Sequence, residues 1–327
     1  MSKVVVFGDL HFRDKEPHYS VCLKFIEWFR DHELNSQDNI GFFLGDIFHK
    51  PKNTGKTNFL VKEFFFSSLK FKKIFILRGN HDYSRREGDA LRVFDQDSRI
   101  EVIRDPKELS IGNVSVLTLP FLYPYSIKDI TGERTTMKTY YENKENPLYS
   151  SKSWDYIFGH FGEESAGKYG QEAEVPFLEG TRVFGHIHLQ MSDVYLGTPY
   201  RTRYDERKRK KFELLSIDSE TKENVRVPIP SFLDYDTIKF GTKIIHEPED
   251  RYVLWDIEEA PSKESALEMY EGHYIREVRK AFTKQDRTLS EDTISSDGFN
   301  VKELFSKYVE TNKVSENVKN LILEEIE

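Results

Sequence analysis

The sequence contains almost no cysteine. Cys22 is the only one in 327 residues, so neither an internal disulfide nor a metal site built from thiolates can form. This composition suits a reducing compartment. We therefore expect a cytoplasmic protein.

Long apolar runs are also missing. No stretch approaches the roughly 18–20 apolar residues that a membrane helix needs, and residues 1–7 have neither the length nor the cleavage pattern of a signal peptide. A basic excess is missing as well, because the formal net charge is -8. That balance argues against a protein that coats nucleic acid by bulk charge, although it allows a local basic groove.

The first half of the chain alternates short apolar runs with amphipathic segments. Residues 4–7, 40–44 and 74–77 are apolar runs. Between the first two, apolar side chains recur at helical spacing, at Cys22, Phe25, Ile26 and Phe29. This alternation predicts a layered α/β sheet whose ligand site lies at the carboxyl ends of the strands.

From about residue 100 to 230 the pattern favours strands. Short strands are expected at residues 101–103, 114–119, 156–158, 181–184, 212–217 and 225–227. Helical spacing is nearly absent there, apart from residues 135–145. We therefore expect a second sheet packed on the first, with helices outside.

The proline-containing stretch 227–231 marks a domain edge. We accordingly divide the chain into a main domain (1–230), a small α+β cap (231–285), a polar linker (286–298) and a helical segment (299–327). Within the cap, the pattern predicts a strand at 252–257 and a helix at 263–282.

Five short motifs follow the apolar runs, and each begins with glycine. They are Gly8-Asp9-Leu10-His11, Gly45-Asp46-Ile47-Phe48-His49, Gly79-Asn80-His81-Asp82, Gly159-His160 and Gly185-His186-Ile187-His188. A glycine would let the backbone turn sharply off the strand and aim the next side chain into a shared site. Six of the ten histidines lie in these motifs, which favours a common function for them.

The chemistry of these side chains favours a metal centre. Carboxylates, imidazoles and one amide, without a thiolate, suit Mn²⁺, Fe or Zn²⁺ better than Ca²⁺. Seven such ligands satisfy two ions ~3.5–4 Å apart if one carboxylate bridges them. Asp46 is the natural bridge, because its strand is expected between the other two. Each residue alone has a plainer interpretation, such as a surface histidine, a turn asparagine or a helix-capping aspartate.

Taken together, the motifs resemble the calcineurin-like metallophosphoesterase superfamily over residues 3–190. The resemblance implies a two-sheet sandwich flanked by helices and two divalent ions, Mn²⁺ or alternatively Mg²⁺. It implies that the first ion is held by Asp9, His11, Asp46 and His188, and the second by Asp46, Asn80, His160 and His186. His81 would then act beside the scissile phosphate as general acid or charge stabiliser, while Asp82 either orients it or is purely structural.

Two features resemble the SbcD / meiotic-recombination-eleven nuclease branch in a compact, phage-like version. Gly45–His49 resembles the branch's Gly-Asp-Leu-Phe-His, whose histidine is associated there with DNA placement and exonuclease action. Residues 195–199 resemble its Gly-Ser/Thr-Pro turn. The branch implies a DNA exonuclease, with endonuclease activity as a further capacity. It also implies membership of an SbcCD-type recombination and repair complex. The compartment would be the host cytoplasm if the chain is phage-encoded. The alternatives are a small-substrate phosphodiesterase or a protein phosphatase of the same superfamily.

The branch also implies three partners. The first is DNA, which we expect to contact a basic stretch of the chain. The alternative is that this stretch is a solvated hairpin. The basic residues in it are Arg201, Arg203, Arg207, Lys208, Arg209 and Lys210. A second basic candidate, on the cap helix and beyond it, consists of Arg276, Arg279, Lys280, Lys284 and Arg287. An ATPase of the SbcC / Rad-fifty type would dock on residues 299–327, unless that segment packs on its own domain. A homodimer contact is expected at residues 64–66 together with Leu91 and Phe94.

Overall fold

A computed structural model describes residues 2–149, 153–163, 172–189, 192–202, 206, 211–244 and 251–280. The linker 286–298 and the segment 299–327 lie outside this part. Within it, no helix combines the length and the apolar character needed to cross a membrane.

The larger sheet has six strands. Their order is β12 (Asn224–Ile229), β11 (Phe212–Asp218), β1 (Lys3–Phe7), β2 (Ile40–Phe43), β3 (Lys73–Leu77) and β6 (Ile100–Ile103). The strands β1, β2, β3 and β6 are parallel; at one edge β11 pairs antiparallel with β1, and β12 pairs antiparallel with β11. The strands expected at 212–217 and 225–227 therefore extend the first sheet.

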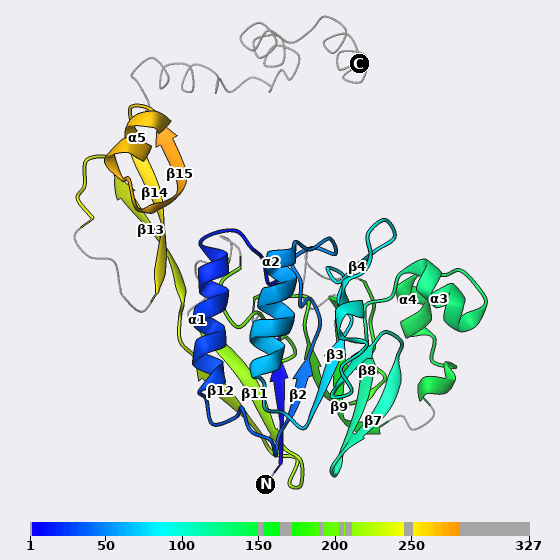
Figure 1. Ribbon diagram of the computed structural model, residues 1–327. Helices are drawn as coiled ribbons and strands as arrows, with labels where there is room; N and C mark the ends of the chain where they lie inside the picture. Colours follow the sequence, from blue (N-terminus) through cyan, green and yellow to red (C-terminus); the bar gives the residue numbers. More distant parts are fainter. Residues whose placement is uncertain are drawn as a thin grey trace, which may run out of the picture.

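A second sheet packs on the first. It contains β10 (Glu179–Phe184), β9 (Ser153–Gly159), β8 (Val114–Leu119) and β7 (Lys107–Ile111), in that order. Outer helices complete the layers: α1 (His18–Arg30) and α2 (Gly55–Asn58) with its continuation η1 (Phe59–Phe65) and η2 (Phe66–Ser68) on one side, α3 (Pro124–Thr131) and α4 (Met137–Glu142) on the other (Figure 1). Two further 3₁₀ turns are η3 (Ala90–Phe94) and η4 (Pro147–Tyr149).

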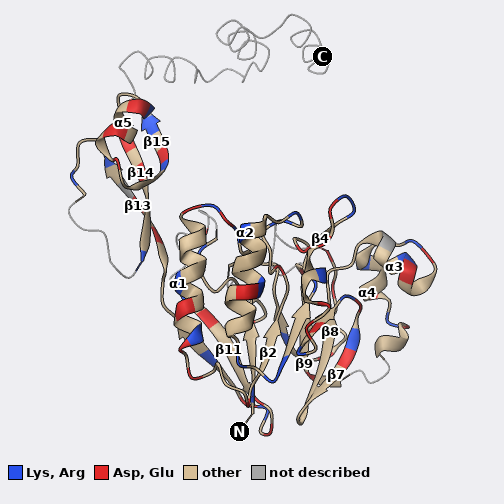
Figure 2. Cartoon of the chain, in the orientation of Figure 1, with Lys and Arg blue, Asp and Glu red and all other residues tan. Residues whose placement is uncertain are grey.

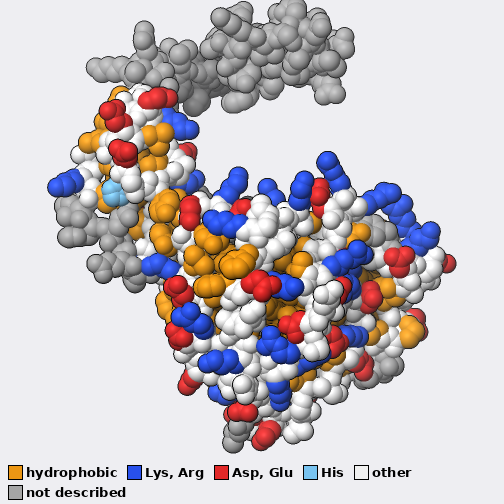
Figure 3. Space-filling model, viewed as in Figure 1, with side chains coloured by type: hydrophobic (Ala, Val, Ile, Leu, Met, Phe, Trp, Pro, Cys, Tyr) orange, Lys and Arg blue, Asp and Glu red, His pale blue; other side chains and the backbone are white. Residues whose placement is uncertain are grey.

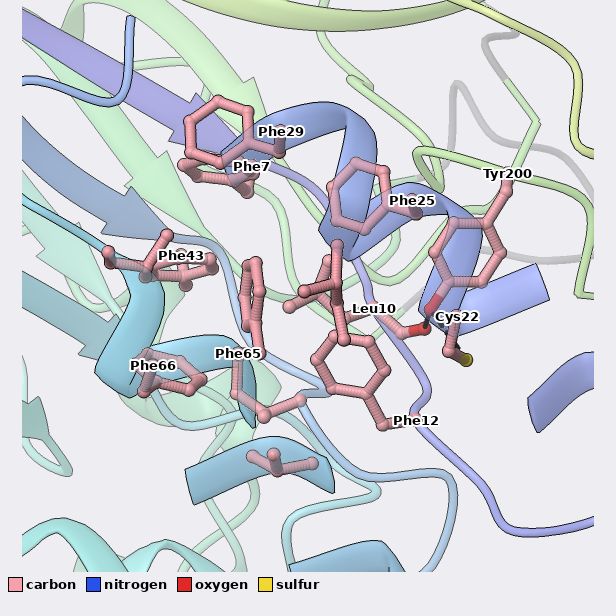
Figure 4. Packing of buried hydrophobic residues seen from close by; sticks show 14 of the residues in the cluster. Phe7, Leu10, Phe12, Cys22, Phe25, Phe29, Phe43, Phe65, Phe66 and Tyr200 are labelled. Atoms are coloured by element: carbon pink, nitrogen blue, oxygen red, sulfur yellow. Dashed lines mark hydrogen bonds between the residues drawn. The ribbon is translucent and has the colours of Figure 1, made fainter. Parts of the chain in front are cut away.

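The layers follow from the alternation of side chains along each strand. In β1, Val5 and Phe7 face the helices, whereas Val4 and Val6 face the second sheet. The helix-side core is rich in aromatic rings, and Figure 4 shows Phe7 between Phe43 and Phe29, with centroids 4.4 and 4.9 Å away. The predicted α/β sandwich with flanking helices is confirmed.

Of the three phenylalanines at residues 64–66, only Phe64 is half-buried. Phe65 and Phe66 are buried, as are Leu91 and Phe94. In the π-helix η1, residues five apart share a face, and Leu60 and Phe65 are both buried; Phe66, the first residue of the 3₁₀ turn η2, is buried as well. Leu91 and Phe94 are therefore not available for the expected dimer contact, which stays a prediction for the half-buried Phe64.

The cap region forms a lobe, defined here as residues 233–280. It contains a parallel sheet, β13 (Leu233–Lys239), β14 (Tyr252–Ala260) and β15 (Tyr274–Lys280), and the helix α5 (Lys263–Met269). The helix predicted over 263–282 is wrong beyond Met269. The helix ends at its cap residue Tyr270, the chain turns through Gly272 with φ 89°, and residues 274–280 then pair with β14 as a strand.

Candidate metal centre

The five motifs meet at the carboxyl ends of strands from both sheets. The first three follow β1, β2 and β3, and the last two follow β9 and β10. A short hairpin, β4 (Tyr83–Ser84) and β5 (Gly88–Asp89), continues directly from the third motif. The structure brings all seven expected metal ligands together in one cluster.

One half of the cluster is centred on His11. Its Nε2 lies 2.8 Å from Nε2 of His188 and 3.5 Å from Oδ2 of Asp46. Burial and the neighbouring His188 hold the pKa of His11 well below its usual value, so its ring is neutral and able to offer a lone pair.

The other half is centred on the side-chain oxygen of Asn80. It lies 3.1 Å from Nε2 of His160 and 2.9 Å from Nδ1 of His186. Nε2 of His160 also lies 3.3 Å from Oδ1 of Asp46. The two carboxylate oxygens of Asp46 therefore face different halves, which is the position expected of a bridge.

The donor set fits a divalent cation. Nδ1 of His160 donates a hydrogen bond to the carbonyl oxygen of Leu44 at 2.6 Å. Its other ring nitrogen, Nε2, faces the side-chain oxygens of Asn80 and Asp46. Within the described residues, Oδ2 of Asp9 and Nδ1 of His11 are buried without a hydrogen-bond partner. Burial opposes a charge on His160, but the adjacent Asp46 carboxylate outweighs it and raises the pKa to about 10. The cluster thus favours positive charge, and its oxygen and nitrogen donors match Mn²⁺, Fe or Zn²⁺.

Glycine is required in the motifs chiefly for close approach. A Cβ on Gly79 would lie 2.1 Å from Oδ1 of Asp46, and one on Gly8 would lie 1.8 Å from the carbonyl oxygen of Gly197. Among the motif glycines only Gly45 has a positive φ, 108°. The left-handed conformations fall on the expected ligands themselves; they are His11 (48°), Asp46 (50°) and His186 (74°). The left-handed backbone strain thus lies mainly at the site residues, and the motif glycines other than Gly45 serve close approach without a positive φ.

Asp82 braces two loops. Its buried carboxylate accepts hydrogen bonds from the backbone N–H groups of Asp46 (2.8 Å), Gly79 (3.0 Å) and Phe48 (3.2 Å). Burial and the nearby Asp46 raise the pKa of Asp82 to about 7. Of the two roles considered for Asp82, this geometry favours the structural one.

His81 is held by other groups. Its Nδ1 lies 2.7 Å from the carbonyl oxygen of His49, and its backbone N–H donates to Oδ1 of Asp46 at 2.8 Å. The half-buried His49 stands at the rim, with its ring centroid 5.8 Å from that of His11 and 5.9 Å from that of His81. The two residues predicted to act on the substrate thus lie side by side.

Sequence patterns missed three residues that support the cluster. Glu206 lies 2.7 Å from Nδ1 of His188, and Glu172 lies 3.0 Å from Nε2 of His186. The hydroxyl of Tyr200 donates to the carbonyl oxygen of Leu10 at 2.5 Å, between two expected ligands. The two glutamates belong to no motif, and only the turn before Tyr200 gives a signal in the sequence.

The basic stretch is only partly described. Arg201 is buried and pairs with Asp234, and it donates to Ser231 at 2.8 Å. Its guanidinium therefore joins the main domain to the start of β13, which corrects its assignment as a DNA contact. The remaining candidates, Arg203, Arg207, Lys208, Arg209 and Lys210, lie outside the described residues.

The basic residues of the lobe are largely neutralised. Arg276 donates to the buried Asp256 at 2.6 Å, and Arg279 pairs with Glu258 at 3.1 Å. Because both guanidinium groups face carboxylates, β15 offers less net positive charge than its sequence indicates. Lys284 and Arg287 lie outside the described residues.

Comparison with known proteins adds one finding. A family model described as calcineurin-like phosphoesterase matches residues 2–190, which is more than half of the chain. A search of curated proteins finds no match to the chain.

Proposed function

The chain belongs to the calcineurin-like phosphoesterase family, whose members use divalent metals to hydrolyse phosphoesters, and on this premise we propose that it is a two-metal DNA nuclease. The proposed activity is that of an exonuclease with a capacity for endonuclease cleavage. Mn²⁺ is the proposed ion, with Mg²⁺ as an alternative.

The residues that would hold the ions are those of the two half-clusters. The first ion is proposed to be held by Asp9, His11, Asp46 and His188, and the second by Asp46, Asn80, His160 and His186. Oδ1 of Asp9 faces the second half, where it lies 3.4 Å from Nδ1 of His160 and accepts a hydrogen bond from the backbone N–H of His186 at 3.0 Å. Its buried Oδ2, which has no hydrogen-bond partner within the described residues, is the oxygen proposed for the first ion. Bound ions would supply Lewis acidity at the phosphate and make water a better nucleophile near neutral pH. The chain itself supplies a rigid, largely buried cradle for them.

His81 is the proposed group that acts on the leaving oxygen. Its Nδ1 faces the His49 carbonyl, so it must interact with substrate through Nε2. Protonated at Nε2, the ring can donate a proton or stabilise developing negative charge. His49 stands next to it at the rim, where it can contact the substrate on either side of the scissile bond.

A basic groove beside His49 is the observation that carries the choice of DNA. The groove has a volume of about 370 Å³, and the side chains along it include four basic ones, Arg13, Lys15, Lys50 and Lys52, against two acidic ones, Asp14 and Glu16. The chain as a whole has a net charge of -8, so a local excess of basic side chains stands out. Such an excess suits a substrate that carries further phosphates beyond the one that is cleaved, as DNA does. Basic side chains also follow the nearby upper rim of the main domain (Figure 3), including Arg85 and Arg86 at the tip of the β4–β5 hairpin (Figure 2).

The test compares two substrates with and without the groove lysines. In the double variant Lys50→Gln/Lys52→Gln, we expect weaker binding of double-stranded DNA and a salt slope smaller by roughly 1–2, because each phosphate contact contributes about 0.9 to that slope. Hydrolysis of a nitrophenyl phosphodiester should stay at the parental rate, because so small a substrate does not reach the groove. Lys62→Gln/Lys70→Gln removes the same charge from exposed positions elsewhere and should leave both activities unchanged.

Opposite results would select another function. Cleavage of the small diester without any cleavage of DNA would favour the small-substrate phosphodiesterase. Hydrolysis of phosphorylated peptides instead would favour a protein phosphatase. Unchanged DNA affinity and salt slope in the lysine variant would remove the groove as support for the nuclease.

We also propose two protein partners. Residues 299–327, outside the described part, are proposed to dock on an SbcC / Rad-fifty type ATPase, and a chain truncated after residue 298 should keep its metal and its nuclease activity while losing that ATPase. Loss of folding on truncation would contradict the docking role. A homodimer is likewise proposed, and light scattering that shows a monomer at micromolar concentration would count against it.

A further inference from the structure

Both histidines of the motif Gly185–His188 meet a glutamate on the ring nitrogen that faces away from the cluster. Nδ1 of His188 lies 2.7 Å from Oε1 of Glu206, while its Nε2 faces His11. Nε2 of His186 lies 3.0 Å from Oε1 of Glu172, while its Nδ1 faces Asn80. The same arrangement thus occurs once in each half of the cluster.

Glu206 is fixed by three donors. Its side chain is 1% exposed. Besides His188, it accepts hydrogen bonds from the backbone N–H of Thr202 at 2.7 Å and from the Thr202 hydroxyl at 2.8 Å. Thr202 is held in turn, because Arg13 donates to its carbonyl oxygen at 2.7 Å. A carboxylate with this many partners has a defined position and direction.

Glu172 is fixed by the loop that follows β9. Its Oε2 accepts a hydrogen bond from the backbone N–H of Gly162 at 2.5 Å, and its own backbone N–H donates to the carbonyl oxygen of Gly162 at 3.0 Å. Gly162 lies two residues after His160, another expected ligand of the same half. Glu172 therefore ties two expected ligands of one ion to each other.

The chemistry of the carboxylate fixes the state of each ring. An ionised carboxylate can only accept hydrogen bonds, so the ring nitrogen facing it must carry the proton. The opposite nitrogen then keeps its lone pair and points into the cluster. A carboxylate behind a ligating histidine holds the ring in place and makes its lone pair a better donor.

We propose that Glu206 and Glu172 are positioning residues for two separate ions. Glu206 fixes the tautomer and direction of His188 for the first ion, and Glu172 does the same with His186 for the second. This inference rests on the metal centre and not on DNA as the substrate, so it is tested without any substrate.

The experiment titrates the metal-free, full-length chain with Mn²⁺ and follows free Mn²⁺ by electron paramagnetic resonance. Glutamine in Glu206→Gln offers one acceptor oxygen to three donors, so we expect one ion to bind about 10–100-fold more weakly and the other as in the parent. Glu172→Gln should weaken the other ion, and the double variant should weaken both. Glu220→Gln, an exposed glutamate far from the cluster, is the matched control and should bind both ions normally.

A second readout reports on the ring itself. In metal-free protein, ¹⁵N-histidine spectra should show His188 protonated at Nδ1, and Glu206→Gln should lose this single tautomer. Thr202→Val keeps the Glu206 carboxylate but removes a hydroxyl that donates to it and that lies 3.0 Å from Nδ1 of His188, so it should weaken the same ion by a smaller factor. That variant tests the inference if Glu206→Gln does not fold.

Three outcomes would overturn the inference. One is parental binding of both ions by folded Glu206→Gln and Glu172→Gln. Another is equal weakening of both ions by either single variant, because the glutamates would then act on the fold and not on one histidine. The last is an unchanged His188 tautomer in Glu206→Gln.

Discussion

The metal-bearing edge of the main domain and the lobe of residues 233–280 are built in opposite ways. At the edge, expected ligands adopt left-handed conformations, and neighbouring loops approach so closely that a single methyl group does not fit at Gly8 or Gly79. The lobe has a small apolar core of its own, with Trp255 and Ile257 among its members, and open space around Gly241 and Gly272. Among the described residues, three of the five non-glycine residues with a positive φ lie at the edge, against one, Glu259 (59°), in the lobe, so strain is greater where chemistry is expected.

The two regions also differ in how they treat buried charge. In the lobe, the buried Asp256 is matched by Arg276 through two hydrogen bonds. At the edge, Asp9 and Asp46 face imidazoles, and within the described residues no lysine or arginine pairs with either of them. Buried carboxylates that lack a cationic side chain are the usual mark of a cation site, whereas a matched pair is the usual mark of structure.

The largest effect is expected from Asp46→Asn. The change keeps the volume of the side chain but removes the charge shared by both halves, so both ions should lose tight binding. Phosphodiester hydrolysis should fall by at least about a thousandfold, because several kcal/mol of charge stabilisation disappear. Mn²⁺ titration and hydrolysis of a nitrophenyl phosphodiester measure both results. Asp38→Asn, an exposed site, is the control, and parental affinity for one ion in Asp46→Asn would rule out the bridge.

His81→Gln should have the next largest effect and should separate chemistry from metal binding. We expect kcat to fall by about 10²–10⁴, the usual contribution of a positioned acid or base. Binding of both ions should be unchanged, because the His81 ring lies outside the two sets of expected ligands. Loss of metal from this variant would show that His81 belongs to the cradle.

Much of this edge could be predicted from the sequence because its residues come in short motifs. Each expected ligand lies within four residues of a strand end. Recognising the strands from their apolar runs is therefore enough to place the ligands at the carboxyl edge of the sheets. The supporting residues could not be found in this way. Glu206 and Tyr200 reach the cluster through contacts with His188 and Leu10 that only the folded chain creates.

The errors elsewhere have local causes. The helix predicted over 263–282 ignored Gly272, where the chain turns after the helix so that Tyr274–Lys280 pairs with β14. Phe65 and Phe66 are both buried because the segment passes from a π-helix into a 3₁₀ turn and does not keep 3.6 residues per turn. In both places pairing or packing decided the structure over the repeat of apolar residues.

Gly79→Ala should have an intermediate effect. The added Cβ would lie 2.1 Å from Oδ1 and 2.4 Å from the backbone nitrogen of Asp46, so one of the loops must move. Strain of about 1–3 kcal/mol is typical of such overpacking, which corresponds to a roughly 10–100-fold loss of Mn²⁺ affinity. Gly55→Ala is the matched control: nothing lies within 4 Å of its Cβ, so it should leave Mn²⁺ affinity at the parental value. Equal Mn²⁺ affinity in the two variants would show that the loops at Gly79 and Asp46 can move apart without disturbing the metal centre.

The smallest effect on the metal is expected from a change in the core of the lobe. Ile257 is fully buried, and Ile257→Ala should lower the free energy of unfolding of the lobe by about 2–5 kcal/mol, because it leaves a cavity. The metal centre should not respond, since its ligands belong to other strands. Ile76→Ala deletes the same atoms from β3, just before the third motif, and should weaken both stability and Mn²⁺ binding. Thermal unfolding and Mn²⁺ titration of the two variants measure this contrast. A loss of Mn²⁺ affinity in Ile257→Ala would show instead that the lobe supports the edge, through the link from Arg201 to Asp234.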